Sequence, residues 1–138
     1  MVKYLLLIAT LALTACQQKP ESSLYQRLGA ETGVENIVDS LLSGIEQDPS
    51  IVHHFSDTDI PRFRRLLIEQ FCELSGGPCK YSGVSMQESH TGFQITQAHF
   101  DALVNHLIAA MQQQKVAIEA QNEFLALLAP MYKDVVYR

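Results

Sequence analysis

Two groups of long helical patterns flank a short, interrupted stretch, Tyr81 to Phe100, and this division constrains the fold more than any other feature. The turn Gly76-Gly77-Pro78 precedes the stretch, which itself contains two further glycines. On both sides, apolar residues recur at steps of three and four, the period of an amphipathic helix. No run alternates with period two. The sequence therefore predicts a single all-α domain, and 138 residues are enough for one core.

The apolar stripes and their flanking residues locate the helices. Ser, Thr and Asp side chains stand where N-caps are needed, and Gly or Pro stands where helices should end. Pro130 is expected to kink the last helix or to open one of its backbone hydrogen bonds. The expected helices cover residues 24–28, 31–47, 60–74, 96–111 and 117–137, with at most a helical turn at 51–55.

His90 stands inside the interrupted stretch among apolar neighbours. Met86 lies four residues before it and Ile95 five residues after it, with Phe93 between. A lone histidine in such a place is ordinarily a surface or capping residue. The apolar flanks point instead to a flat apolar cofactor held by one metal–imidazole bond, which makes His90 the candidate metal ligand.

The other histidines are not assigned as ligands. His53 and His54 are adjacent, and adjacent residues of a helix point about 100° apart, so polar packing is expected for them. His99 and His106 are spaced to share a helical face. A zinc pair is conceivable there, but no third ligand is spaced to help, and structural zinc sites normally have four.

The first fifteen residues predict a secretory signal peptide. Lys3 gives a positive start, and the apolar run that follows is too short to span a membrane. Leu13-Thr14-Ala15-Cys16 is similar to a bacterial lipobox, in which Cys16 becomes the lipidated first residue of the mature chain. Gln17 after it favours sorting to the outer membrane, facing the periplasm. The expected division is a signal peptide at 1–15, a lipidated tether at 16–23 and a folded domain at 24–138.

The charge balance excludes two kinds of partner. The chain has 10 Lys and Arg residues against 15 Asp and Glu, a formal net charge of −5, and cleavage would also remove Lys3. An acidic surface argues against nucleic acid, whose affinity for proteins comes largely from cations set against phosphates. It also argues against binding anionic lipid by charge. The lipid anchor is therefore the only membrane contact expected.

Cys72 and Cys79 are a disulfide candidate, because they remain as a pair once Cys16 is assigned to lipid and the compartment is oxidising. Cys72 falls late in a helix and Cys79 just past Gly76-Gly77-Pro78. Such a turn can bring the two Cα atoms within the required distance of roughly 4.4–6.8 Å. The bridge would clamp the segment that leads to His90.

Three arginines, Arg62, Arg64 and Arg65, lie in the first turns of the helix expected at 60–74. The helix macrodipole makes that position slightly unfavourable for cations. Two interpretations stay open, namely a nearby anionic group that offsets the mismatch and a solvated charged face.

Residues 24–138 resemble a group 1 truncated haemoglobin, the small globin of the two-over-two helical sandwich. No single motif is specific, but their order and ungapped spacing are. The motifs are Ser23-Leu24-Tyr25, Arg27-Leu28-Gly29, Asp48-Pro49, Phe55, Gly76-Gly77-Pro78, Tyr81-Ser82-Gly83, Ser85-Met86, His90, Ile95-Thr96, His99-Phe100, Ala129-Pro130 and Asp134-Val135.

The resemblance implies haem b and a role for each matching residue. His90 falls where the family has the proximal histidine that binds the iron, and Phe55 where an aromatic ring stacks on the haem. Tyr81 and one of Arg62 or Arg65 are expected at the propionates. The positions expected to line the pocket are Phe63, Leu67, Phe71, Met86 and Ile95.

The distal side departs from the family pattern. Members of group 1 usually have a Tyr in the second helix and often a Gln in the next long helix, and both hydrogen-bond bound oxygen. The ungapped match puts Leu42 and Leu67 there, with Phe63 beside them, and neither leucine can donate a hydrogen bond. Gln70 is one turn further along and would need a shift in register. We therefore expect fast escape of oxygen.

The function expected is reversible binding of oxygen or another diatomic gas, such as CO or NO, rather than enzymatic turnover. One alternative is a haem enzyme of the nitric oxide dioxygenase or peroxidase type. It would need an external reductase, because the chain has no flavin or dinucleotide motif. The sequence is also compatible with a gas or redox sensor, with a haem carrier that docks a partner, and with a helical lipoprotein without haem.

Overall fold

The computed structural model describes residues 22–138, and the expected signal peptide, Cys16 and most of the tether lie outside this part. The described residues contain helices and no strand, so the all-α class is confirmed. None of these helices combines the length and the apolar character that crossing a membrane requires. The elements are α1 (Leu24–Arg27), α2 (Ala30–Glu46), η1 (Val52–Phe55), α3 (Ile60–Leu74), α4 (Met86–His90), α5 (Gln97–Gln113), α6 (Ile118–Leu128), η2 (Ala129–Met131) and α7 (Tyr132–Val135).

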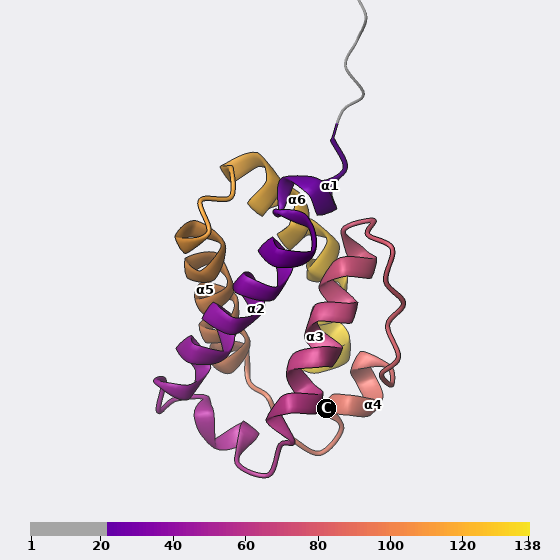
Figure 1. Cartoon of the computed structure of the whole chain (residues 1–138). Helices are drawn as coiled ribbons and strands as arrows, with labels where there is room; N and C mark the ends of the chain where they lie inside the picture. Colours follow the sequence, from indigo (N-terminus) through magenta and orange to yellow (C-terminus); the bar gives the residue numbers. More distant parts are fainter. Residues whose placement is uncertain (1–21) are drawn as a thin grey trace, which may run out of the picture.

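Helix α2 packs against both α5 and α3 and runs between them in Figure 1. Its apolar stripe is buried almost completely, because its members recur every three or four residues and so share one face. The same core takes side chains from α5 and α6. Its largest fully buried members are Leu28, Val34, Ile37, Val38, Leu41, Ile51, Met111 and Phe124.

Side-chain caps fix where four of the described helices begin, namely α1, α3, α4 and α5. Ser23 accepts a hydrogen bond from the Gln26 backbone N–H, and the Gln26 side chain accepts one from the Ser23 N–H. Asp59 caps α3. Thr96 Oγ1 accepts from the His99 N–H at 3.2 Å at the start of α5. Such a cap contributes typically ~1 kcal/mol relative to alanine, which explains why these boundaries could be located in the sequence.

The last helix differs from expectation, because the single helix predicted at 117–137 is divided into α6, η2 and α7. Pro130 lies in η2, where it has no backbone N–H to continue the α-helical pattern. After α7 the chain is extended at Val136. The Tyr137 N–H then donates to the Ile95 carbonyl at 2.8 Å, and Gly92 donates to an Arg138 oxygen at 3.1 Å. The final residues thus brace the loop that follows His90.

A long loop connects α3 to α4, and a disulfide holds its first part. Cys72 and Cys79 are bridged, with their Cα atoms 5.7 Å apart. Gly77 sits inside the closed turn, where an added Cβ would lie 2.6 Å from Cys72 Sγ and 2.8 Å from a Tyr25 ring carbon. Glycine is therefore required there by space. After the bridged turn, the chain runs back towards α4 without forming a further helix (Figure 1).

Candidate functional site

His90 is the last residue of α4, and two hydrogen-bond partners determine its tautomer. Its Nδ1 atom lies 2.7 Å from the Met86 carbonyl oxygen and 3.0 Å from Ser89 Oγ. A carbonyl oxygen can only accept, so Nδ1 must carry the hydrogen. The Nε2 lone pair is then available to a metal, and the ring orientation is held from behind. This is the state that an imidazole needs in order to bind iron.

The apolar residues expected to line a pocket are only partly covered by the protein. Unlike the core face of α2, they remain half-buried in the folded chain. Phe55 and Phe63 pack on each other with ring centroids 5.4 Å apart and so join η1 to α3. The half-buried set comprises Leu42, Phe55, Phe63, Leu67, Met86 and Ile95. A flat apolar group is suited to this surface, since its burial would gain about 25 cal/mol per Å².

Two phenylalanines differ in exposure from this half-buried set. Phe71 is only 4% exposed and meets Phe124 edge to face, with ring centroids 4.9 Å apart. It therefore belongs to the main core, and its place in the haem-pocket lining stays a prediction. Phe93 is 48% exposed and adds little to the apolar surroundings of His90.

On the side expected to be distal, Leu42 and Leu67 are half-buried and pack against the main core. Neither brings a polar atom. Gln70, one turn beyond Leu67, has its amide nitrogen 3.4 Å from Met86 Sδ and 4.0 Å from Met131 Sδ. The Gln70 side chain therefore reaches towards the helix that carries His90, and it does not take the place of Leu67.

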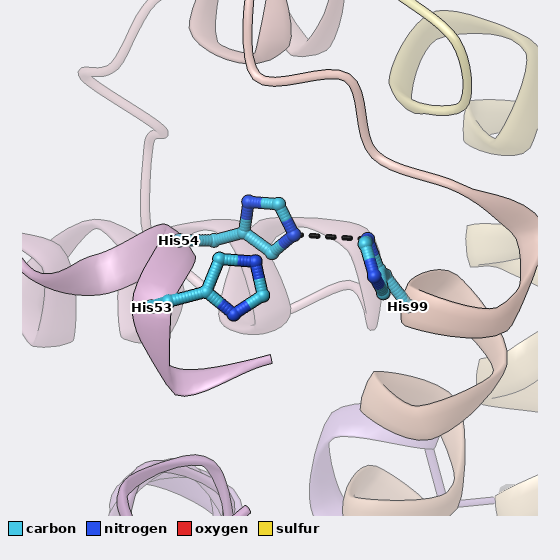
Figure 2. A group of neighbouring side chains, drawn as sticks. All are labelled: His53, His54 and His99. Carbon is cyan, nitrogen blue, oxygen red and sulfur yellow. Dashed lines mark hydrogen bonds between the residues drawn. The ribbon is translucent and has the colours of Figure 1, made fainter. Parts of the chain in front are cut away.

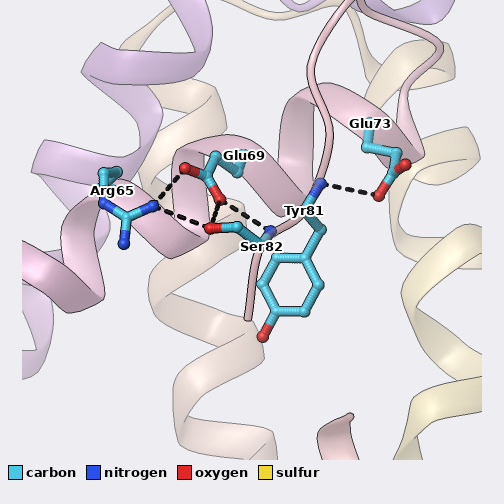
Figure 3. Close-up of polar contacts among 5 residues, drawn as sticks. All are labelled: Arg65, Glu69, Glu73, Tyr81 and Ser82. Atoms are coloured by element: carbon cyan, nitrogen blue, oxygen red, sulfur yellow. Dashed lines mark hydrogen bonds and ion pairs between the residues drawn. The ribbon is translucent and has the colours of Figure 1, made fainter. Parts of the chain in front are cut away.

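Two carboxylates of α3, one helical turn apart, hold the second part of the α3–α4 loop (Figure 3). Glu69 accepts hydrogen bonds from the backbone N–H and the hydroxyl of Ser82, at 2.9 and 2.6 Å. The hydroxyl of Ser82 is the larger cause that holds the pKa of Glu69 below its ordinary value. Glu73 accepts from the Tyr81 N–H at 3.1 Å, which lowers the pKa of Glu73 in the same way. These contacts fix Tyr81 and Ser82 over α3.

The arginines of α3 find different partners. Arg64 binds Asp39 of α2 through two hydrogen bonds, and this contact lowers the pKa of Asp39. Arg65 pairs with Glu69, one turn along, and also donates to Ser82 Oγ (Figure 3). Within residues 22–138, the side chain of Arg62 forms no ion pair. Carboxylates of the chain therefore offset two of the three cations.

Tyr81, also expected near the propionates, is engaged within its own loop. Its hydroxyl donates to the Val84 carbonyl at 3.0 Å. Partial burial is the main cause that raises the pKa of the Tyr81 hydroxyl. Of the two arginines expected at the propionates, Arg62 is thus the one whose side chain forms no ion pair within residues 22–138.

The remaining histidines separate into two groups that the sequence did not reveal. His106 Nε2 lies 2.8 Å from an Asp48 carboxylate oxygen, so it does not share a site with His99. Hydrogen bonds, from Ser50 first and then from His106, lower the pKa of Asp48 to about 2. His53, His54 and His99 instead meet where η1 lies beside the first turn of α5 (Figure 2). Burial is the main cause that lowers the pKa of His54.

Comparison with known proteins agrees with this geometry. The family described as bacterial-like globin matches residues 23–137, almost all of the described chain. The chain belongs to the bacterial-like globin family. The globin is 34% identical over 98 residues to a group 1 truncated haemoglobin of Nostoc sp. (strain MUN 8820), covering 71% of this chain and 83% of the relative. A group 1 truncated haemoglobin of Synechocystis sp. (strain ATCC 27184 / PCC 6803 / Kazusa) is 32% identical over 117 residues, covering 81% and 94% of the two chains.

Solved structures give the same assignment of the fold. The globin aligns with the crystal structure of truncated haemoglobin from Tetrahymena pyriformis in the Fe(III) form, with a TM-score of 0.81 and 26% identity. The alignment covers 85% of this chain and all of that one. The two-over-two arrangement expected from the resemblance is therefore confirmed, and with the Nostoc relative it places the globin among group 1 truncated haemoglobins.

Several residues that shape the site were not identified in the sequence. The Met86 carbonyl, which sets the tautomer of His90, could have been found from the spacing of four within one helix. Glu69 and Glu73 are also four residues apart and so share one helical face. Their carboxylates could have been proposed from this spacing as acceptors for the following loop. Nothing local marked Gln70 or Met131 as neighbours, since they lie 61 residues apart.

Proposed function

We propose that this globin binds haem b through His90 and reversibly binds a diatomic gas in an apolar distal pocket. The observation that carries the proposal is the hydrogen bond from His90 Nδ1 to the Met86 carbonyl, 2.7 Å long. In the neutral imidazole, this hydrogen bond leaves the lone pair on Nε2, at the end of a helix bordered by half-buried apolar side chains. Haem iron, when bound, supplies an open coordination position that takes up O2, CO or NO reversibly.

The chain's own residues divide the work of holding the cofactor. His90 would bind the haem iron through Nε2, and Met86 and Ser89 fix its ring. Phe55 and Phe63 present a pair of packed rings for the flat face. Arg62 would hold a propionate, because Arg65 is paired with Glu69 of α3 and with Ser82, and the Tyr81 hydroxyl donates to the Val84 carbonyl. The half-buried Leu67, Met86 and Ile95 would exclude water from the space around a bound iron.

The distal side sets the lifetime of the gas complex. Leu42 and Leu67 donate no hydrogen bond, and the amide of Gln70 is turned towards Met86 Sδ. A hydrogen bond to a bound ligand is worth ~0.5–1.5 kcal/mol, and more when the acceptor carries charge. Without such donors, oxygen leaves faster than it does from a pocket with a distal Tyr and Gln. The same pocket discriminates less against CO and NO.

An absorption spectrum of the haem-reconstituted chain tests this function, with His90→Ala as the variant and His106→Ala as the matched control. We expect the wild type and the control to give a haem band that sharpens on reduction and shifts with CO. The His90→Ala variant should lose the histidine-bound spectrum. If the wild type and His90→Ala take up haem with the same spectrum, His90 is not the ligand.

We also propose that the globin is exported and anchored by lipid on Cys16, facing the periplasm at the outer membrane. The lipobox-like Leu13-Thr14-Ala15-Cys16, Gln17 and the acidic net charge of −5 support this placement. The Cys72–Cys79 bridge supports an oxidising compartment. Metabolic labelling with a fatty-acid analogue tests it: the label should enter the wild type and be absent from Cys16→Ala. Labelling of both would refute the anchor.

An external reductase is the partner that this function implies. The chain carries no flavin or dinucleotide motif with which to return ferric iron to the ferrous state. A reductase of the same compartment would have to do so, and a soluble electron donor that reduces the ferric protein only in the presence of an envelope extract would support it.

A further inference from the structure

Three imidazoles converge where η1 meets the first turn of α5. His53 and His54 come from η1 and His99 comes from α5, and the rings of His54 and His99 point at each other (Figure 2). One nitrogen of each ring lies within 4.8 Å of the nitrogens offered by the other two. His54 Nε2 and His99 Nδ1 are 2.9 Å apart. None of these atoms takes part in the contacts of His90.

We propose that His53, His54 and His99 form a binding site for a divalent transition-metal ion of the zinc class, with water in the remaining coordination positions. The site is separate from the haem ligand and uses a different part of the fold. Three protein nitrogens with an open position form a known type of zinc coordination. Neutral imidazole is a suitable ligand for Zn²⁺, Cu²⁺ and Ni²⁺ alike.

The surroundings of the three rings favour a metal over an ion-pair cluster. Among residues 22–138, the histidine that pairs with a carboxylate is His106, through Asp48, and no carboxylate pairs with His53, His54 or His99. The ring centroids of His53 and His54 are 4.0 Å apart and those of His54 and His99 are 4.6 Å apart. Each neutral imidazole has one nitrogen lone pair that a metal could use.

The geometry needs only small movements to accept the ion. In a tetrahedral site with zinc–nitrogen bonds of about 2.05 Å, neighbouring nitrogens are about 3.3 Å apart. The His54–His99 pair must therefore open slightly from 2.9 Å, and His53, which is exposed, must turn inward. His99 Nδ1 also accepts a long hydrogen bond, 3.3 Å, from the Thr96 N–H. A metal at that atom replaces this bond, while Thr96 Oγ1 still caps α5 by accepting from the His99 N–H.

A metal at this position would connect two segments that are 45 residues apart in the sequence. The segment η1 ends at Phe55, whose ring packs on Phe63 of α3. A bound metal would therefore restrain η1. Through Phe55 it would also restrain the packed rings of Phe55 and Phe63, which are expected to line the haem pocket.

Zinc titration of the haem-loaded full chain tests the proposal, with binding followed by calorimetry and by competition with a chromophoric chelator. We expect one ion per chain in the wild type. The variants His53→Asn, His54→Asn and His99→Asn should each bind at least tenfold more weakly, since even the loss of a residue behind a metal ligand costs 10–100-fold in affinity. The control His106→Asn, outside the cluster, should bind like the wild type.

A spectroscopic arm identifies the ligands directly. Cu²⁺ added to the ferric, haem-loaded protein should give a copper electron paramagnetic resonance signal, separated in field from that of high-spin ferric haem, with nitrogen couplings that His54→Asn diminishes and His106→Asn does not. Circular dichroism establishes that each variant is folded, and if His99→Asn is not, the two η1 variants decide. The proposal is overturned if the wild type shows no saturable binding up to millimolar Zn²⁺, or if the cluster variants bind like the wild type.

Discussion

Reduction of the Cys72–Cys79 bridge should lower the free energy of unfolding by about 2.4 kcal/mol at 25 °C. The two cysteines are seven residues apart, and closing so short a loop removes this amount of chain entropy from the unfolded state. For a domain of roughly 115 residues, the same loss lowers the melting temperature by about 10 °C. The turn that the bridge closes has other hydrogen bonds that do not depend on the bridge, among them the Gly77 N–H to the Cys72 carbonyl at 2.8 Å and the Tyr25 N–H to the Ser75 carbonyl at 2.9 Å.

Urea unfolding of the oxidised and reduced chain, followed by far-ultraviolet circular dichroism, measures this difference without creating a cavity at Cys72, which is only 1% exposed. A Cys16→Ala background ensures that only the bridge responds to the reductant. Glu73→Ala is the matched comparison, because it removes the acceptor of the Tyr81 N–H while the bridge stays closed. A difference between oxidised and reduced protein below ~0.5 kcal/mol would refute the chain-entropy reasoning.

Three further predictions concern the pocket and its borders. Leu42→Tyr should slow oxygen dissociation by roughly one to two powers of ten in stopped-flow measurements, since ~1.4 kcal/mol is tenfold; an unchanged rate would contradict the apolar distal pocket. Because the pKa of Glu69 is lowered in the folded chain, its contribution is full above the ordinary value of 4.5 and is lost as pH falls through the lower folded value. Glu69→Gln should therefore flatten the acid dependence of stability in that window. Arg62→Gln should speed haem transfer to an acceptor globin up to ~5-fold, whereas Arg64→Gln, whose partner is Asp39, should not.

The fold was largely predictable because its signals are local. The stripe of α2 and the caps Ser23, Asp59 and Thr96 are each contained in a few consecutive residues. The last helix was not predicted correctly, since the sequence shows that Pro130 interrupts the backbone pattern but not whether the chain kinks or divides. That outcome depends on how the final residues reach Ile95, a contact between Tyr137 and a residue far earlier in the chain.

The candidate site was predictable where spacing within one element determines a contact. Arg65 and Glu69, four apart on α3, form such a pair, and they account for one cation that had suggested an anionic ligand. The pairing of Arg64 with Asp39 spans 25 residues and required the packing of α2 on α3. The meeting of His53 and His54 with His99 was invisible for the same reason. Helical spacing can exclude a shared face but cannot exclude convergence from two elements.

The two kinds of burial in this domain have a consequence for which property a substitution changes. The fully buried residues of α2, α5 and α6, among them Val38 and Phe124, pack on one another, whereas the side chains around His90 are half-buried. Substitutions in the first group therefore remove burial that stabilises the chain itself, and substitutions in the second group alter the surface expected to hold haem. Stability and haem affinity can then vary separately among related chains, because they depend on different side chains of one small domain.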